Sequence, residues 1–184
     1  MGGWKRICWA GNEKQMPPGV KPVILPQIGT MNTTPGPALL IVDDEPMVLL
    51  TLKAVLVRVN YQVTTVERPI EALKLVEATN YAVIISDHRM PEMTGLDFLA
   101  HCRRLRPTSS RILLTAVLNL QEVMEAIDRE EICRFLAKPW LREELLAAVG
   151  DAVQRNELTV RNAALREETQ RLNALLVSAG ISRP

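Results

Sequence analysis

Between residues 38 and 155, short apolar runs and helix-like segments alternate five times. The apolar runs are rich in Val, Ile and Leu, and they lie at residues 38–44, 61–66, 81–87, 111–117 and 132–140. The helix-like segments lie at residues 46–60, 68–80, 96–107, 118–128 and 141–154. In the first of them, apolar residues recur at a helical spacing of three and four, at Leu49, Leu52, Leu56 and Val59. The pattern predicts five βα units in succession.

Strands that are apolar on both faces are typical of a parallel sheet with helices packed on each side. Because βα crossovers are right-handed, five such units predict a doubly wound α/β fold of the flavodoxin-like kind, with a five-stranded parallel sheet. In these folds the functional groups lie just beyond the carboxyl ends of the strands, near the point where the strand order reverses. The residues that follow each predicted strand are therefore the first candidates for chemistry.

Polar side chains follow four of the five predicted strands. Asp43 and Asp44 end the first, Asp87 ends the third, Thr115 ends the fourth, and Lys138 ends the fifth. Since parallel strands bring their carboxyl ends to one edge of the sheet, we expect three carboxylates, a hydroxyl and an ammonium group to converge there. Taken singly, each of these residues is ordinary, as a strand end or a helix start rich in acids. Their joint placement indicates a site.

Carboxylates that converge repel one another, and this repulsion must be offset. Two like charges about 4 Å apart repel by roughly 4 kcal/mol at an effective dielectric constant of 20, so either some carboxyls are protonated or a cation lies among them. Oxygen ligands without His or Cys favour Mg²⁺. The first predicted strand is followed by no glycine-rich phosphate loop, so nucleotide binding has no support. The residue types suit phosphoryl transfer with an aspartate as the nucleophile.

Four motifs at these strand ends carry a family resemblance. They read LLIVDDEP, IISDHRMPEMTG, ILLTA and FLAKPW along the chain. With them, residues 38–155 resemble the receiver domain of two-component response regulators. The resemblance implies that Asp87 is the phosphoacceptor. It also implies a Mg²⁺ site in which Asp44 and Asp87 are ligands, Asp43 acts through water, and Arg89 contributes its backbone carbonyl.

The same resemblance assigns roles to four further residues. Thr115 and Lys138 correspond to the residues that contact the phosphoryl group and start the switch. Phe135 corresponds to the aromatic residue that couples to that switch, although the family more often has Tyr there. Gly95 corresponds to a loop glycine. Arg89 occupies a position that influences the lifetime of the aspartyl phosphate in the family.

Residues 156–184 predict a helical or coiled-coil extension that prolongs the fifth helix, because residues 156–179 contain no proline. A heptad pattern with Leu at the d positions runs through Leu158, Asn162, Leu165, Thr169, Leu172 and Leu176. We call these six residues the seam. Asn162 would fix the register of a parallel dimer. At about three heptads the helix is marginal alone, and the alternative is a helix that folds back on the receiver.

Residues 1–37 hold six prolines and show no sustained periodicity, which predicts a disordered leader. Met31 precedes a short polar run into the first predicted strand, so translation that begins at Met31 is one hypothesis. The mass of the natural protein tests it.

Composition excludes several classes of protein. The net charge of +1 lacks the large positive excess that is typical of proteins that bind nucleic acid directly. The three cysteines, Cys8, Cys102 and Cys133, form no zinc or disulfide pattern. No apolar run approaches the length of a membrane span, so we expect a cytoplasmic protein with no membrane partner.

The functional prediction is a receiver that accepts phosphate from a histidine kinase or phosphotransfer protein. It would signal through protein contacts of the fourth helix, fifth strand and fifth helix, as a homodimer or with a helical partner, and not as an enzyme. One alternative is a truncated amino-terminal part of a larger regulator with a transcriptional or cyclic-dinucleotide output. Another is a coiled-coil adaptor that acts without phosphorylation.

Overall fold

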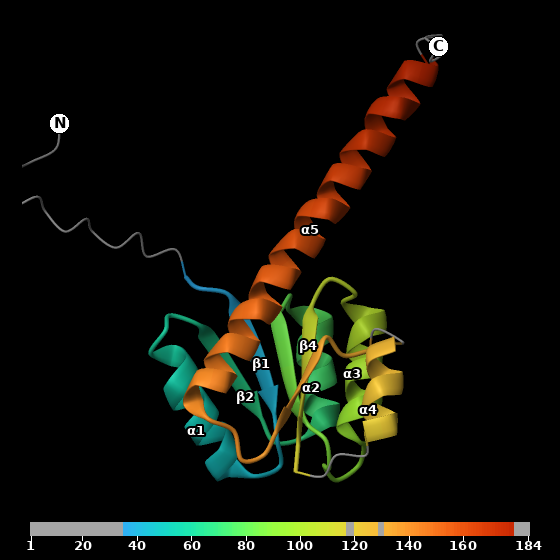
Figure 1. Ribbon diagram of the computed structural model, residues 1–184. Coiled ribbons are helices and arrows are strands. Elements are labelled where there is room, and N and C mark those ends of the chain that lie inside the picture. The colour runs from blue at the N-terminus through green and yellow to red at the C-terminus, as the bar shows by residue number, and fades with distance from the viewer. Residues whose placement is uncertain (1–34, 117–119, 129–130, 179–184) are drawn as a thin grey trace, which may run out of the picture. The chain divides into compact units, whose positions relative to one another are not determined.

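Five strands and five helices alternate in a computed structural model that describes residues 35–116, 120–128 and 131–178 (Figure 1). The strands are β1 (Ala38–Val42), β2 (Gln62–Val66), β3 (Val83–Asp87), β4 (Ser110–Thr115) and β5 (Arg134–Ala137). The helices are α1 (Pro46–Val57), α2 (Pro69–Ala78), α3 (Gly95–Leu105), α4 (Leu120–Asp128) and α5 (Arg142–Ser178). All strand pairs are parallel, in the order β2-β1-β3-β4-β5. The predicted doubly wound fold is confirmed, and the strand order reverses at β1 and β3.

Two hydrophobic clusters lie on opposite faces of the sheet. Because successive strand residues point to opposite faces, Leu39 and Ile41 of β1 join one cluster, while Leu40 and Val42 join the other. Helices α1 and α5 cover the first face, and helices α2, α3 and α4 cover the second. This parallel sandwich places the carboxyl ends of the strands along one edge of the sheet.

Burial differs between the central and the edge strands. Strands β1, β3 and β4 are buried almost throughout, whereas β2 and β5 are partly exposed. The expectation of strands apolar on both faces therefore holds for the three central strands, because each edge strand has a neighbour on one side only. Val59 also departs from the prediction: it lies beyond the end of α1 and is exposed, so the buried stripe ends at Leu56.

Helix α5 is one continuous helix of 37 residues, which corresponds to about 55 Å. Its first part packs on the sheet through Leu145, Ala148, Val149, Ala152 and Val153. From residue 157 to residue 178 every side chain is exposed. The predicted helical extension is confirmed for residues 156–178, and within these described residues it does not fold back on the receiver.

The predicted leader at residues 1–37 falls almost wholly outside the described residues, as does the hypothesis about Met31. Within the part of the chain that the structure describes, no helix combines the length and the apolar character that crossing a membrane requires.

Cys102 of α3 gives a first testable prediction. Its side chain is fully buried, and burial raises the pKa of the thiol to about 12. At pH 8 only roughly one Cys102 thiol in ten thousand is then a thiolate, the reactive form. In a Cys8→Ser variant, iodoacetamide should label the partly exposed Cys133 and leave Cys102 unmodified until denaturant unfolds the chain. Peptide mass spectrometry measures this, and equal labelling of both thiols in the native protein would contradict the packing of α3.

Candidate functional site

Asp43 directly follows β1 and is completely buried. Its Oδ1 accepts a hydrogen bond from the backbone N–H of Glu45 at 2.9 Å, which holds the turn into α1. Its Oδ2 accepts from Lys138 Nζ at 2.7 Å. The first strand end is thus joined to the fifth across the middle of the sheet.

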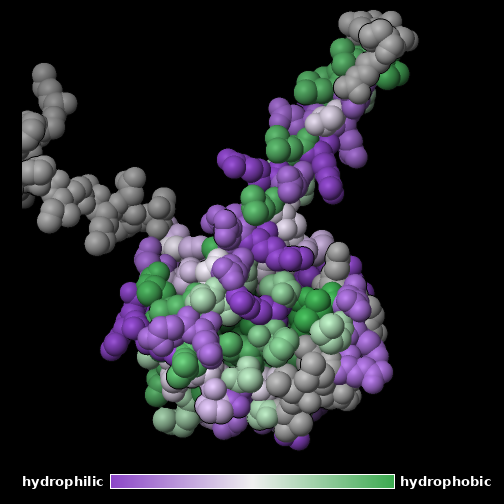
Figure 2. Space-filling view, in the orientation of Figure 1, coloured by the Kyte–Doolittle hydropathy of each residue, from purple (hydrophilic) through white to green (hydrophobic). Residues whose placement is uncertain are grey.

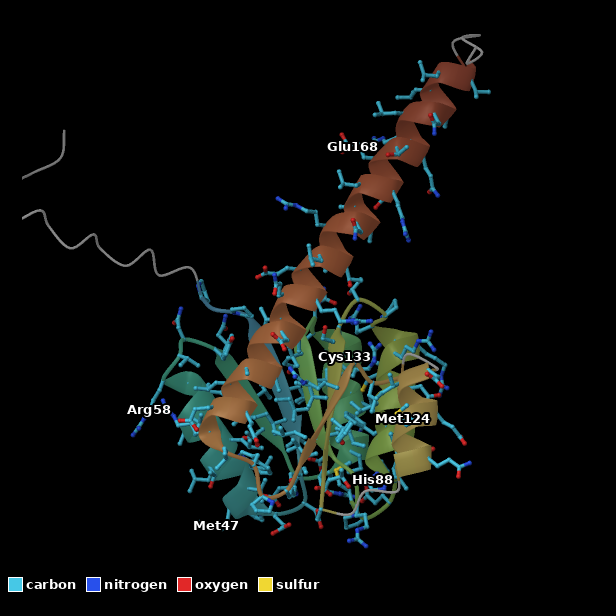
Figure 3. All side chains as sticks on the ribbon, viewed as in Figure 1. Met47, Arg58, His88, Met124, Cys133 and Glu168 are labelled. Carbon is cyan, nitrogen blue, oxygen red and sulfur yellow. The ribbon has the colours of Figure 1, made fainter. Side chains whose placement is uncertain are left out.

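Asp87 is the last residue of β3, and its side chain is 10% exposed. The backbone N–H of Arg89 donates to Oδ2 at 2.6 Å, and Lys138 Nζ lies 2.5 Å from Oδ1. One ammonium group therefore contacts both buried carboxylates. The carboxyl ends of β1, β3 and β5 meet as predicted, and Figure 3 shows Met47 and His88 at this same end of the molecule.

The electrostatics of the site follow from burial. Burial raises the pKa of Asp43 above its ordinary value, and contacts with Lys138 and the Glu45 N–H offset only part of this effect. Burial alone would lower the pKa of Lys138, but the hydrogen bonds to Asp43 and Asp87 outweigh it and hold that pKa above its ordinary value. Lys138 is therefore a firmly charged cation in a pocket that requires one.

Thr115 and Phe135 are placed by the strand register. Thr115 ends β4 and is buried, and its carbonyl accepts from the Lys138 N–H at 2.8 Å. Phe135 of β5 pairs with Leu113 of β4, two residues before Thr115, and packs partly buried against the cluster that includes α4. Thr115 therefore follows the residue that pairs with Asp87, and Phe135 packs against the cluster that contains Ala126 of α4.

Gly95, the first residue of α3, contacts the backbone of Asp87 in a way that the sequence did not reveal. Its N–H donates to the His88 carbonyl at 2.8 Å. A Cβ at this position would lie 1.9 Å from the Asp87 carbonyl oxygen, well inside contact distance. Residue 95 must therefore lack a side chain so that the loop can close behind Asp87.

A second contact missed from the sequence links this loop to the end of β2. Arg68 Nε and one terminal nitrogen contact Glu92 Oε1 at 2.9 and 2.5 Å. Glu92 has a φ of 74°, a conformation that favours glycine. The charge contact restrains the loop between β3 and α3. A positive φ at Glu92 has no sequence signal, and without it the pair cannot be predicted.

The family model of the response regulator receiver domain matches residues 39–150. The match covers more than half of the 184 residues and includes every strand end described above. The chain belongs to the response regulator receiver domain family. It is thus a receiver of two-component signal transduction, in agreement with the resemblance of its motifs.

The receiver is similar to the hydrogenase transcriptional regulatory protein HoxA of Bradyrhizobium diazoefficiens, with 31% identity over 63% of this chain and 24% of that protein. A signal receiver domain of an HD domain-containing protein from Pseudomonas fluorescens has 31% identity and a TM-score of 0.65, covering 70% of this chain and 94% of that one. A structure named as an adenylate cyclase from Rhodopirellula baltica has 31% identity and a TM-score of 0.68, over 72% and 98%. This chain spans 24% of HoxA and 26% of the regulator GlrR of Escherichia coli.

The remaining predicted ligands of the receiver are less enclosed than Asp43 and Asp87. Asp44 is exposed beside the pocket, and so is Arg89. Among the described residues, no three carboxylate, imidazole or thiol groups are gathered closely enough to hold a metal ion. In this arrangement the Lys138 ammonium supplies the positive charge between the two buried carboxylates.

The six seam residues lie apart from the pocket. All of them belong to the exposed stretch of α5, whereas the pocket lies at the carboxyl ends of the strands. The receiver therefore has two separate candidate sites, the carboxylate pocket and an exposed helix with leucines at heptad spacing.

Proposed function

We propose that Asp87 accepts a phosphoryl group from the phosphohistidine of a histidine kinase or phosphotransfer protein. The observation that carries this proposal is the single Lys138 ammonium bonded to both Asp43 and Asp87 at one edge of the sheet. A carboxylate oxygen of Asp87 attacks phosphorus, and the P–N bond to the histidine breaks with its electron pair returning to the imidazole. The product is an aspartyl phosphate, and the chain is a phosphoacceptor and not a turnover enzyme.

The neighbouring side chains have distinct parts in this step. Lys138 already contacts Asp87, so its charge is in place to stabilise the oxygens of the transferring group. The Thr115 hydroxyl would donate a hydrogen bond to one of those oxygens after transfer. Phe135 would then carry the change from Thr115 to the surface formed by α4, β5 and α5.

Mg²⁺ fits the chemistry of the donor set, which consists of hard oxygen ligands. Asp44, Asp87 and the carbonyl of Arg89 would hold the ion, with Asp43 acting through water. Asp43 is buried, this burial raises its pKa, and it contacts an ammonium group, so a cation close by offsets the cost of its buried charge. When bound, Mg²⁺ neutralises charge on the phosphoryl oxygens.

Exposed apolar side chains on α1 support a protein donor that docks beside the pocket. Met47 and Leu50 are 70% and 61% exposed, and α1 begins only two residues after Asp44. A donor histidine that reaches Asp87 brings its protein against this helix. The extension of α5 would form a second protein contact, with another copy or a partner helix.

A second candidate is a receiver that works within a larger regulator. The length of the similar transcriptional regulators favours it, because the matched segment is about a quarter of each. Both candidates share the chemistry at Asp87, and they differ in where the signal goes. The coding sequence around this chain distinguishes them.

Asp87→Asn provides the test of the proposed function. With Mg²⁺ and acetyl phosphate, we expect the wild-type chain to gain the mass of one phosphoryl group and the variant to gain none. Asp128→Asn, which alters an exposed carboxylate on α4, should behave as the wild type. Intact-protein mass spectrometry measures the gain. An equal gain in Asp87→Asn would remove Asp87 from its role, and no gain in any variant would favour the coiled-coil adaptor.

A further inference from the structure

The part of α5 beyond the sheet exposes a row of leucines to solvent. Leu158, Leu165 and Leu172 are each 54% exposed, and Leu176 is 40% exposed. Figure 2 shows hydrophobic side chains distributed along this part of the helix between hydrophilic ones. Leucines at heptad spacing on an exposed helix face are typical of a coiled-coil interface. The exposed helix therefore needs a partner.

We propose that two copies of this chain pair along the seam as a parallel, in-register coiled coil. The inference rests on the proposed role of the α5 extension as a partner-binding helix, and it names the partner and its orientation. It does not depend on the chemistry at Asp87.

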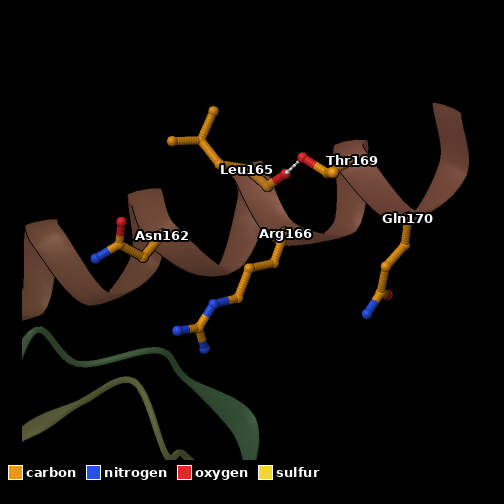
Figure 4. A pocket seen from close by; sticks show the side chains of 5 residues that line it. All are labelled: Asn162, Leu165, Arg166, Thr169 and Gln170. Carbon is orange, nitrogen blue, oxygen red and sulfur yellow. Dashed lines mark hydrogen bonds between the residues drawn. The ribbon is translucent and has the colours of Figure 1, made fainter. Parts of the chain in front are cut away.

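The polar seam residues decide the orientation. Thr169 Oγ1 donates to the Leu165 carbonyl at 2.8 Å, so its hydroxyl is satisfied within the helix (Figure 4). Thr169 can therefore enter an interface through its methyl group. The other members of the seam are four leucines and Asn162. Asn162 is thus the one seam residue whose polar atoms need a partner across the interface.

In a parallel, in-register pair the amide of Asn162 meets the same amide of the second copy, and the two can hydrogen-bond. In the antiparallel alignment that overlaps the whole seam, Asn162 instead faces Leu172 of the second copy. That arrangement buries two amides without partners, which is costly. Because the Asn162 amide needs a hydrogen-bond partner, the parallel pair is favoured.

The flanking charges do not reverse this preference. The parallel pair places Arg161 beside Arg166 of the second copy, but the full antiparallel alignment also brings like charges together, at Arg166 and at Glu168. Exposed ion pairs of either sign contribute little, because water and salt screen them. An antiparallel alignment shifted by one heptad pairs Arg161 with Glu168, but it leaves Leu172 and Leu176 without apolar partners.

Cysteine cross-linking tests the orientation in the full-length chain. In a Cys8→Ser, Cys133→Ser background, Leu158→Cys and Leu172→Cys are introduced separately. Each should form a disulfide-linked dimer with copper phenanthroline and oxygen, because in-register positions meet their own counterparts. Gln170→Cys is the matched control and should stay monomeric on a denaturing gel, since Figure 4 shows Gln170 pointing away from Leu165.

Cys102 can remain in all of these variants because it is buried and its thiol pKa is about 12. Analytical ultracentrifugation adds a second measurement. We expect the wild-type chain to dimerise and Leu165→Ala to raise the dimer dissociation constant at least tenfold, or about 1.4 kcal/mol. A monomeric wild type, or self-cross-linking of neither leucine position, would overturn the inference. Because phosphorylation of Asp87 is measured separately, either result leaves the proposed function to its own test.

Discussion

Gly95→Ala is expected to destabilise the receiver by about 3 kcal/mol, the upper range for overpacking a buried site. The added methyl group would lie 1.9 Å from the Asp87 carbonyl oxygen, and a backbone atom cannot move aside as a flexible side chain can. Either the loop between β3 and α3 opens or Asp87 shifts. We therefore expect a lower urea midpoint at unchanged m-value and a slower gain of phosphoryl mass.

Gly150→Ala is the matched control for this prediction. Gly150 lies within α5, and a Cβ there would have no atom within 4 Å. Alanine is the better helix former by about 1 kcal/mol, so this variant should be slightly more stable than the wild type. If the two variants lose stability equally, the close approach of Gly95 to Asp87 is not what limits the site.

Lys138→Met is expected to have the second large effect. Methionine has an apolar side chain of similar length to lysine, but it lacks the charge that contacts Asp43 and Asp87. Breaking a buried charge cluster by removing one partner costs on the order of 3 kcal/mol. In Mg²⁺-free buffer at pH 7 we expect that loss of stability, and with Mg²⁺ we expect phosphoryl acceptance roughly 100-fold slower.

The effect of Lys138→Met on stability should also depend on pH. Burial already raises the pKa of Asp43, and removal of the ammonium raises it further. A carboxyl whose pKa is higher in the folded chain than in the unfolded chain favours folding as protons bind. The stability that the variant loses relative to the wild type should therefore shrink as the pH is lowered from 7. Lys53→Met, on the exposed face of α1, should change stability by less than about 0.5 kcal/mol. Equal behaviour of the two variants would contradict the bridging role.

The sequence predicted the convergence of Asp43, Asp87 and Lys138 because strand polarity alone determines it. Five βα units with right-handed crossovers place every carboxyl end at one edge, whatever the details of the loops. The continuation of α5 followed from the lack of proline between residues 156 and 179. Both features follow from the order of the βα units and from local composition, which can be read directly from the sequence.

The contacts that the sequence did not predict depend on backbone conformation within the loops. The positive φ of Glu92 brings its carboxylate to Arg68, and the close approach of Gly95 to Asp87 depends on how the preceding turn closes. Nor does residue type indicate that Lys138 contacts both carboxylates at once. The Mg²⁺ ligands, the switch roles of Thr115 and Phe135, and the dimer seam stay predictions.

Reductive trapping of the aspartyl phosphate identifies which carboxylate of the receiver accepts the phosphoryl group. The wild-type chain is incubated with Mg²⁺ and acetyl phosphate, reduced with borohydride, digested and sequenced by tandem mass spectrometry. Borohydride converts an aspartyl phosphate to homoserine, which marks the acceptor permanently. We expect homoserine at Asp87 and at no other aspartate, including Asp43 and Asp44. Homoserine at a different aspartate, or none under conditions that give a phosphoryl mass gain, would contradict Asp87 as the phosphoacceptor.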